Sequence, residues 1–274
     1  MSKMFPVSFV CFVFIFSFAA RSQQSDLTIS TPEEIRKDLQ KVPCSRKERR
    51  FDIRNLFQKM GASPAEIDDK VADVWNISTS IPGKSTDQIV IGAHYDFRPP
   101  GCGAIDNWSG IVAINHLYRS IKSAPLNKSV IFVTFDGEEA GLAGSAKLVN
   151  KIPKDQLPRY CAMINIDSLG LANPFAMTNS SSPKMISLAS EQAAISQIPF
   201  SSTPIPGADA DSSSFRMVGI PAITLSGITG NWYEILHTKK DQQKRVNPAS
   251  VYLGYRLALA VWNQIDSAPC EAFR

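Results

Sequence analysis

The chain of 274 residues has only three histidines, and it lacks the motifs of several common hydrolases. It contains no His-Glu-x-x-His and no Gly-x-Ser-x-Gly, so it does not support a helix-based single-metal protease or an α/β-hydrolase serine enzyme. No Cys-x-x-Cys pair occurs, which argues against a metal knuckle or a dithiol redox motif. We find neither an internal repeat nor a low-complexity linker. With 44% hydrophobic residues, the chain is most simply one large domain.

Charge of one sign is not concentrated over any long stretch. The formal net charge is +4, and the one tight basic cluster is interrupted by Glu48. The cluster consists of Arg46, Lys47, Arg49 and Arg50. It falls in a helical pattern, which predicts a solvated helix face, and nothing else in the sequence supports nucleic-acid binding.

Only the N-terminus carries an apolar run of a length near that of a membrane span. Lys3 precedes roughly 15 apolar residues, and small residues follow at Ala19, Ala20 and Ser22, as in a secretory signal peptide. We assign this signal peptide to residues 1–22. A retained membrane anchor is the alternative, although the run is shorter than the ~20 residues of a spanning helix. We therefore expect an exported protein, periplasmic or extracellular, without stable membrane association after cleavage.

Helix-start signals dominate the segment that follows. Thr31 precedes a proline and is followed three residues later by Glu34, which is the pattern of a capping box. The same signal recurs at Ser45 and Ser63. These signals predict helices over residues 31–70.

From residue 71 onward, strand patterns alternate with helix patterns. Strands are expected at 71–81, 87–96, 129–136, 160–167 and 221–225, and helices at 110–122, 141–150, 183–196 and 247–266. This alternation predicts an α/β fold: a single domain with a mixed, mostly parallel central sheet and helices on both faces. In such sheets, ligands bind in the crevice beyond the carboxyl ends of the strands.

Chemically reactive side chains lie where several predicted strands end. They are His94, Glu138, Glu139 and Asp167. Because parallel strands end at one edge of a sheet, these four residues should converge. Asp106, in a glycine-bracketed loop, and His237, in a loop before the last helix, complete a set of imidazoles and carboxylates that suits zinc.

Each of these residues also has an ordinary structural interpretation. Asp106 could cap a helix or stabilise a turn, and His237 could be a surface histidine. The pair Glu138-Glu139 could form a solvated turn, but two carboxylates directly after an apolar run are costly to bury unless they are paired or bind metal. The same argument applies to Asp167.

His94 and Asp96 are two residues apart on an extended segment, so their side chains leave the same face. A metal-bound imidazole usually donates its other N–H to a carboxylate, and Asp96 is placed for that role. A core histidine beside a surface aspartate is the alternative for this pair.

Five segments together carry a family resemblance: AHYD, GAIDNWSG, FDGEEAGLAGS, INIDSLG and LHTKKD. In order and local context they resemble the co-catalytic di-zinc aminopeptidases, a family that also includes glutamate carboxypeptidase and glutaminyl cyclase. The resemblance covers roughly residues 70–265. It implies a zinc-exopeptidase-like fold and matches the helix-rich N-terminal segment less clearly. We divide the chain into a helical segment, 23–70, packed on the core, and a catalytic domain, 71–274.

The resemblance implies two zinc ions per chain and five ligands. The expected ligands are His94 and Asp167 for one ion, Glu139 and His237 for the other, and Asp106 as the bridge. The implied catalytic residues are Glu138, as the general base, and Asp96, which orients an imidazole. It also implies a cis peptide bond after Asp106. The segment ADSSSF departs from the family, because Ser212 stands where histidine is usual, and we assign that position no role.

The function implied is hydrolysis of N-terminal residues from peptides by a secreted zinc exopeptidase. A glutaminyl-peptide cyclotransferase with a single zinc ion is the first alternative, because HYD, FDGEEA and HT-x-x-D also fit that branch. A non-catalytic binding ectodomain, as in transferrin receptor, is the second. It is disfavoured because every ligand position is filled. The sequence makes no prediction about oligomeric state.

The cysteines beyond the leader are Cys44, Cys102, Cys161 and Cys270. Four cysteines in an exported protein allow three disulfide connectivities. We expect Cys102 and Cys161 not to pair. Cys102 follows the strand that carries His94, whereas the strand that begins at Cys161 places it about 20 Å below the metal edge. If a bond joins the ends of the chain, Cys44 with Cys270 is the first pairing to test.

Overall fold

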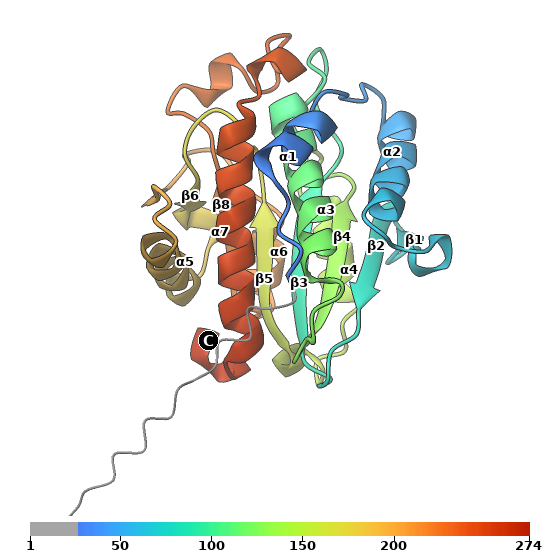
Figure 1. Cartoon of the computed structure of the whole chain (residues 1–274), viewed down its shortest axis with the longest axis vertical. Coiled ribbons are helices and arrows are strands. Elements are labelled where there is room, and N and C mark those ends of the chain that lie inside the picture. Colours follow the sequence, from blue (N-terminus) through green and yellow to red (C-terminus); the bar gives the residue numbers. More distant parts are fainter. Residues whose placement is uncertain (1–26) are drawn as a thin grey trace, which may run out of the picture.

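The computed structural model describes residues 27–274. The signal peptide expected at 1–22 lies outside the described residues. The described part is built on an eight-stranded sheet with the strand order β1-β2-β4-β3-β5-β8-β6-β7 (Figure 1). The strands are β1 (Asp68–Val71), β2 (Asn76–Ile81), β3 (Gln88–His94), β4 (Ser129–Phe135), β5 (Tyr160–Ile166), β6 (Phe175–Met177), β7 (Ser201–Thr203) and β8 (Ala222–Ser226).

The centre of the sheet is parallel and its flanks are mixed. Strands β4, β3, β5 and β8 pair in parallel, whereas β2 and β6 pair antiparallel with β4 and β8. Each central parallel strand therefore ends at the same edge, which lies at the top of Figure 1. The mixed, mostly parallel α/β sheet expected from the sequence is confirmed.

Helices cover both faces of the sheet. They are α1 (Pro32–Asp38), α2 (Arg46–Lys59), α3 (Ser109–Ile121), α4 (Ala143–Asn150), α5 (Pro183–Ile195), α6 (Ser212–Met217) and α7 (Pro248–Ser267). In Figure 1, α1, α3 and α7 lie in front of the sheet, and α4 and α6 lie behind it. Successive side chains of β3 point to opposite faces of the sheet and so contribute to both cores. Ile89 and Ile91 pack into the front core, and Val90 packs into the rear one.

The longer elements agree with the sequence-based expectations to within a few residues. Three short ones were not expected: β6, β7 and α6 are three, three and six residues long. Elements of this length contain too few residues to show a periodic pattern. The segment 31–70 holds α1 and α2 as expected, but it ends in strand β1, which pairs antiparallel with β2.

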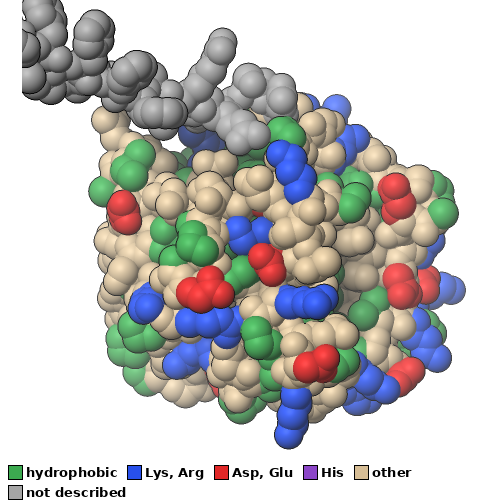
Figure 2. Space-filling model, turned by 90° about the horizontal axis from the view of Figure 1, so that it is seen from below, with side chains coloured by type: hydrophobic (Ala, Val, Ile, Leu, Met, Phe, Trp, Pro, Cys, Tyr) green, Lys and Arg blue, Asp and Glu red, His purple; other side chains and the backbone are tan. Residues whose placement is uncertain are grey.

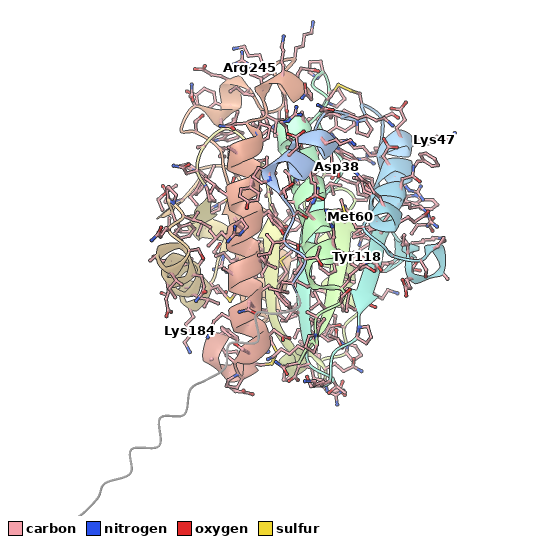
Figure 3. All side chains as sticks on the ribbon, viewed as in Figure 1. Asp38, Lys47, Met60, Tyr118, Lys184 and Arg245 are labelled. Carbon is pink, nitrogen blue, oxygen red and sulfur yellow. A yellow bond between two sulfur atoms is a disulfide. The ribbon has the colours of Figure 1, made fainter. Side chains whose placement is uncertain are left out.

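A buried polar network attaches the N-terminal segment to the core. His116 of α3 lies between Ser30 and Asp38, with its Nδ1 2.8 Å from the serine Oγ and its Nε2 3.3 Å from Asp38 Oδ2. Asp38, labelled in Figure 3, also pairs with Lys59 of α2. His116, the third histidine of the chain, therefore has a structural role in joining α3 to the N-terminal segment. The division of the chain at residues 70 and 71 stays a prediction.

The solvated helix face expected for the basic cluster holds only in part. Lys47 is exposed and points away from the core (Figure 3), and Arg46 is also exposed. The prediction is wrong for Arg49, which has no exposed surface. Its guanidinium group donates hydrogen bonds to the backbone carbonyls of Tyr95 and Gly103, so a single member of the charged run turns inward.

Two disulfides link the four cysteines beyond the leader. They are Cys44–Cys102 and Cys161–Cys270. The expectation that Cys102 and Cys161 do not pair is confirmed. The Cys44–Cys270 pairing is wrong, because Cys44 precedes α2 at the carboxyl edge of the sheet, whereas Cys270 follows α7 at the opposite edge, where β5 begins. Sequence distance from the motifs does not tell which end of the sheet a loop reaches.

The surface viewed from the opposite edge of the sheet carries mixed charge. In Figure 2, lysine and arginine side chains are interspersed with aspartate and glutamate over the described part of that face. None of the helices in residues 27–274 is both long enough and apolar enough to cross a membrane.

Candidate metal centre

The carboxyl edge of the central strands brings the predicted site residues together. His94 is the last residue of β3, Glu138 and Glu139 follow β4, and Asp167 follows β5. Asp106 reaches the same point from the loop before α3, and His237 from the loop before α7. These six side chains line one cleft of about 530 Å³.

The carboxylate of Asp106 lies between the two histidines of the cleft. Its Oδ1 is 3.1 Å from Nε2 of His94, and its Oδ2 is 2.9 Å from Nε2 of His237. One carboxylate therefore presents a separate oxygen to each imidazole, which is the geometry of a bridging ligand.

The remaining carboxylates divide between the two sides of Asp106. On one side, Nε2 of His94 lies 3.5 Å from Asp167 Oδ1 and 4.0 Å from Glu138 Oε2. On the other, Nε2 of His237 lies 3.1 Å from Glu139 Oε1. The side chains form two compact groups of potential metal ligands, His94 with Glu138 and Asp167, and Asp106 with Glu139 and His237.

Asp96 lies beneath the cleft and supports three of its members. It is fully buried, and Nδ1 of His94 lies 3.2 Å from its backbone carbonyl oxygen and 3.5 Å from its Oδ1. Its two oxygens accept hydrogen bonds from the backbone N–H groups of Glu138, at 3.1 Å, and Glu139, at 3.2 Å. Asp96 therefore positions one histidine and both glutamates and does not touch the cleft itself.

Asp241 performs the corresponding task beneath the Asp106 loop. Its carboxylate accepts hydrogen bonds from the backbone N–H groups of Ile105, at 2.8 Å, and Asp106, at 3.2 Å. Burial raises the pKa of Asp241 to about 6, against the opposing effect of these donors. This residue was not singled out from the sequence, although it is the last residue of the quoted segment LHTKKD.

Asn107 ties the same loop to the end of β5. Its side-chain amide donates to the carbonyl of Ile166 at 2.8 Å, and its Oδ1 accepts from the N–H of Ser168 at 3.1 Å. The peptide bond between Asp106 and Asn107 is cis, as the resemblance implied. The loop that carries Asp106 is thus fixed to the strand that carries Asp167.

Arg49 stabilises the other side of this loop region from helix α2. Besides Tyr95 and Gly103, its guanidinium group reaches the carbonyls of Pro43 and Cys102. Burial lowers the pKa of Arg49 to about 10, although nearby carboxylates, Asp106 foremost, favour its charged form. No sequence signal separates this residue from its exposed neighbours in the basic cluster.

The two carboxylates at the centre of the cleft differ in their electrostatics. Burial raises the pKa of Asp106, but hydrogen bonds from His237 and His94 outweigh that effect and hold the pKa well below its ordinary value. Burial also raises the pKa of Glu138, and here it prevails, so the pKa lies well above its ordinary value. Of the two, Glu138 is the group that more readily holds a proton.

A further buried carboxyl group, Asp211, lies close enough to Glu138 to raise its pKa. Burial raises the pKa of Asp211 itself to about 7. It directly precedes Ser212, whose hydroxyl donates to the carbonyl of Ser180 at 2.7 Å inside the rear layer. We assigned Ser212 no role from the sequence, and the hydrogen bond that its hydroxyl group donates is a structural one.

One wall of the cleft is apolar. It is formed by Met177, Ile205, Ile228, Trp232 and Leu236. Arg98 also lines the cleft, and its Nε lies 3.0 Å from Glu139 Oε2. The cleft therefore combines potential metal ligands with an apolar surface, an arrangement suited to a ligand with both a polar and an apolar end.

With this fold and this arrangement of imidazoles and carboxylates, the comparison with known proteins is direct. The chain belongs to peptidase family M28, whose family model matches residues 76–261. The match contains every potential metal ligand of the cleft. The family that the sequence resembled is thereby confirmed.

Curated relatives match over about a third of this chain. The chain is 37% identical to aminopeptidase YwaD of Bacillus subtilis over 87 residues, which are 32% of this chain and 19% of that protein. It is 32% identical over 100 residues to the probable leucine aminopeptidase 2 of Arthroderma benhamiae, 36% of this chain and 20% of that protein. The matched stretch thus spans about a fifth of the length of these relatives.

Solved structures share the fold over much more of the chain. The LapA aminopeptidase of Legionella pneumophila superimposes with a TM-score of 0.71 at 20% identity, covering 88% of this chain and 77% of that one. A glutaminyl cyclase from an Acidobacteriales bacterium superimposes with a TM-score of 0.68 at 18% identity, covering 97% and 99%. At these identities the likeness concerns the fold alone.

Proposed function

We propose that the chain is a zinc-dependent aminopeptidase that removes N-terminal residues from peptides. The observation that carries this proposal is the Asp106 carboxylate, which presents one oxygen to His94 and the other to His237. It is supported by the relatives named aminopeptidases and by membership of peptidase family M28.

The donor set fits two zinc ions. With zinc–ligand bonds of about 2.0–2.1 Å, two ligand atoms on one tetrahedral ion lie about 3.3 Å apart. The separations between the imidazole nitrogens and the assigned carboxylate oxygens are 2.9 to 3.5 Å. His94 and Asp167 would hold one ion, Glu139 and His237 the other, and Asp106 both. In the described part of the chain the buried Oε1 of Glu139 makes no hydrogen bond of acceptable geometry, although Nε2 of His237 is 3.1 Å away, as expected for two ligand atoms of one ion.

Glu138 is the member of the cleft left free for proton transfer. Bound zinc would lower the pKa of a water molecule and polarise the carbonyl of the scissile bond. Glu138 would accept the proton of the attacking water and donate it to the leaving amine. Its neighbour in sequence, Glu139, points instead toward His237, and Asp96 holds the backbone of both.

The apolar wall indicates the kind of residue that is removed. Met177, Trp232 and Leu236 lie in the same cleft as the metal-ligating residues. An apolar side chain at the peptide N-terminus would be buried against them, which stabilises the complex in proportion to the area removed from water. Free N-terminal leucine, methionine or phenylalanine is therefore the favoured substrate.

The proposal is tested with purified protein and a panel of aminoacyl p-nitroanilides, with and without a chelator. We expect release of p-nitroaniline from the leucine and methionine amides, weak release from the aspartate and lysine amides, and loss of release after chelation. Hydrolysis that is insensitive to a chelator, or absent with every amide, would contradict the proposal.

Glutaminyl-peptide cyclisation is the second candidate, because the fold matches the bacterial glutaminyl cyclase over 97% of this chain and 99% of that one. The same panel is therefore run beside a peptide with N-terminal glutamine. Ammonia release and loss of the free amine from that peptide, with no hydrolysis of the amides, would favour the cyclase, as would a single tightly bound zinc ion.

We also propose that the protein is exported. The two disulfides support this, because such bonds persist in oxidising compartments. Expression with the native N-terminus, followed by fractionation and alkylation of free thiols, tests it. Accumulation in the cytosol with all five cysteines as reactive thiols would contradict it.

A further inference from the structure

A second cleft adjoins the metal cleft and shares a wall with it. It has a volume of about 390 Å³, and Ile205, Ile228 and Trp232 line both clefts. Its floor is Phe175 of β6, and its rim includes Ser201 and Thr203 of β7. Both volumes lie in the range of small-ligand sites.

The two clefts lie along one strand. Met177 lines the metal cleft and Phe175 lines the second one. The two residues are two positions apart on β6, so their side chains leave the same face of the strand roughly 6.6 Å apart. An extended peptide has the same spacing between its first and third side chains. A peptide that lies along this wall therefore matches the spacing of the clefts.

The residues of the second cleft favour an apolar occupant. Phe175, Ile205, Ile228 and Trp232 belong to one apolar cluster, and no charged residue lines this cleft in the described part of the chain. The hydroxyl groups of Ser201 and Thr203 lie at its exposed rim. An aromatic or branched aliphatic side chain would be buried there, whereas a charged side chain would lose water without gaining a partner.

Resting on the proposed aminopeptidase function, we infer that the second cleft binds the third residue of a peptide whose first residue occupies the metal cleft. Trp232 belongs to the wall of both clefts, so the two clefts form one continuous surface. A peptide chain that leaves the metal cleft along β6 reaches Phe175 after two residues, which favours the third residue of the peptide as the occupant. Selectivity at the third position then follows from the same wall that selects the first.

The first test compares three substrates that share the Leu–Gly bond to be cleaved: Leu-Gly-Phe-amide, Leu-Gly-Gly-amide and Leu-Gly-Lys-amide. We expect kcat/KM for the phenylalanine peptide to be about tenfold higher than for the glycine peptide, in keeping with partial burial of one aromatic side chain. The lysine peptide should show no gain over glycine. Equal values for all three peptides would overturn the inference.

A matched pair of variants on β7 locates the effect. Ser201 pairs with Phe175 and shares its face, whereas Ser202 pairs with Ala176 and lies on the opposite face. Ser201→Trp should fill the second cleft and bring the phenylalanine-to-glycine ratio close to one, and Thr203→Trp should do the same. Ser202→Trp should keep the wild-type ratio. Because each ratio compares two substrates on one variant, a general loss of activity cancels.

A binding experiment separates this inference from the proposed activity. Calorimetric titration of the Glu138→Gln variant with the same peptides needs no turnover. A tighter Kd for Leu-Gly-Phe-amide that is lost on adding Ser201→Trp supports the subsite even if no peptide is hydrolysed. Equal affinities for the phenylalanine and glycine peptides, or a preference that survives both Ser201→Trp and Thr203→Trp, would overturn it.

Discussion

At the residue scale, the adjacent glutamates after β4 differ in what surrounds them. Glu139 lies between His237 and Arg98: its Oε1 is 3.1 Å from Nε2 of His237, and its Oε2 is 3.0 Å from Nε of Arg98. Glu138 has no arginine or lysine partner among the described ion pairs and is 4.0 Å from His94. Because adjacent residues point in different directions, the carboxylate of Glu139 is held by its partners, whereas that of Glu138 is not.

Replacing Glu138 with glutamine should therefore remove turnover and keep the metal. We expect kcat to fall by about 10²–10⁴-fold, since that is the usual contribution of a general base. Zinc content, measured by elemental analysis, should stay near the wild-type value. The matched control is Glu139→Gln, which should lose zinc together with activity, as should Asp106→Asn. If Glu138→Gln strips the metal and Glu139→Gln does not, the two roles are reversed.

Asp96→Asn tests a buried carboxylate that acts through its neighbours. The substitution replaces one acceptor oxygen by an NH₂ group facing a backbone N–H donor, so one of the hydrogen bonds to Glu138 and Glu139 is lost. We expect zinc affinity or kcat/KM to fall by about 10–100-fold. Asp73→Asn is the control, because Asp73 pairs with Lys151 at the exposed surface and should have little effect. A wild-type zinc affinity and rate for Asp96→Asn would exclude a positioning role.

At the scale of elements, helix α2 is joined to the metal edge by two arginines, Arg46 and Arg49, and by a disulfide just before the helix. Arg46 lies 3.6 Å from a carboxylate oxygen of Asp96. Arg49 donates to the carbonyls of residues 95 and 103, and Cys44 is bonded to Cys102. The segment between His94 and Asp106 has no regular structure over most of its length and depends on these contacts. The helical N-terminal region thus contributes to the shape of the site without supplying a ligand.

Arg49→Ala should destabilise this connection strongly. It leaves several buried carbonyls without donors, and we expect a loss of about 3 kcal/mol in the free energy of unfolding, measured by denaturant titration. Lys47→Ala, at an exposed position two residues away on α2, should change stability by less than about 0.5 kcal/mol. Similar small effects for both variants would show that water replaces the guanidinium group.

At the scale of the whole molecule, bound metal would connect segments that are far apart in sequence. The proposed ligands come from residue 94 to residue 237, and four carboxylates of the site converge with two imidazoles in one cleft. Without cations, this cleft gathers like charges in a partly buried place. Metal binding to the folded state alone would therefore stabilise the whole domain.

Chelation should lower the melting temperature as well as abolish activity. Two ions held at free concentrations 100-fold above their Kd would contribute about 5 kcal/mol in total. Differential scanning calorimetry with and without a chelator measures this shift, and added zinc should restore both melting temperature and activity. The Asp106→Asn variant is the control, since its melting should respond little to the chelator. An unchanged wild-type melting temperature would argue against tightly bound metal.

The sequence by itself determined the central elements and the residues at their ends. Apolar runs of about seven residues predicted β3, β4 and β5, because strands buried on both faces are apolar over almost their whole length. Longer helical patterns predicted α3 and α7. Since parallel strands end at one edge, His94, Glu138, Glu139 and Asp167 could be placed together without coordinates. The loop residues Asp106 and His237 required the family resemblance, because a loop carries no periodic signal.

Only the tertiary structure determined which end of the sheet each loop reaches and whether a given side chain points into the core. It separated buried Arg49 from exposed Lys47 two residues away, and it paired Cys44 with Cys102. It also placed Phe175 and Met177 under two adjoining clefts, on a strand of three residues. Local sequence sets the conformation of each segment, whereas contacts between distant segments depend on how all of them pack, and that information is distributed over the whole chain.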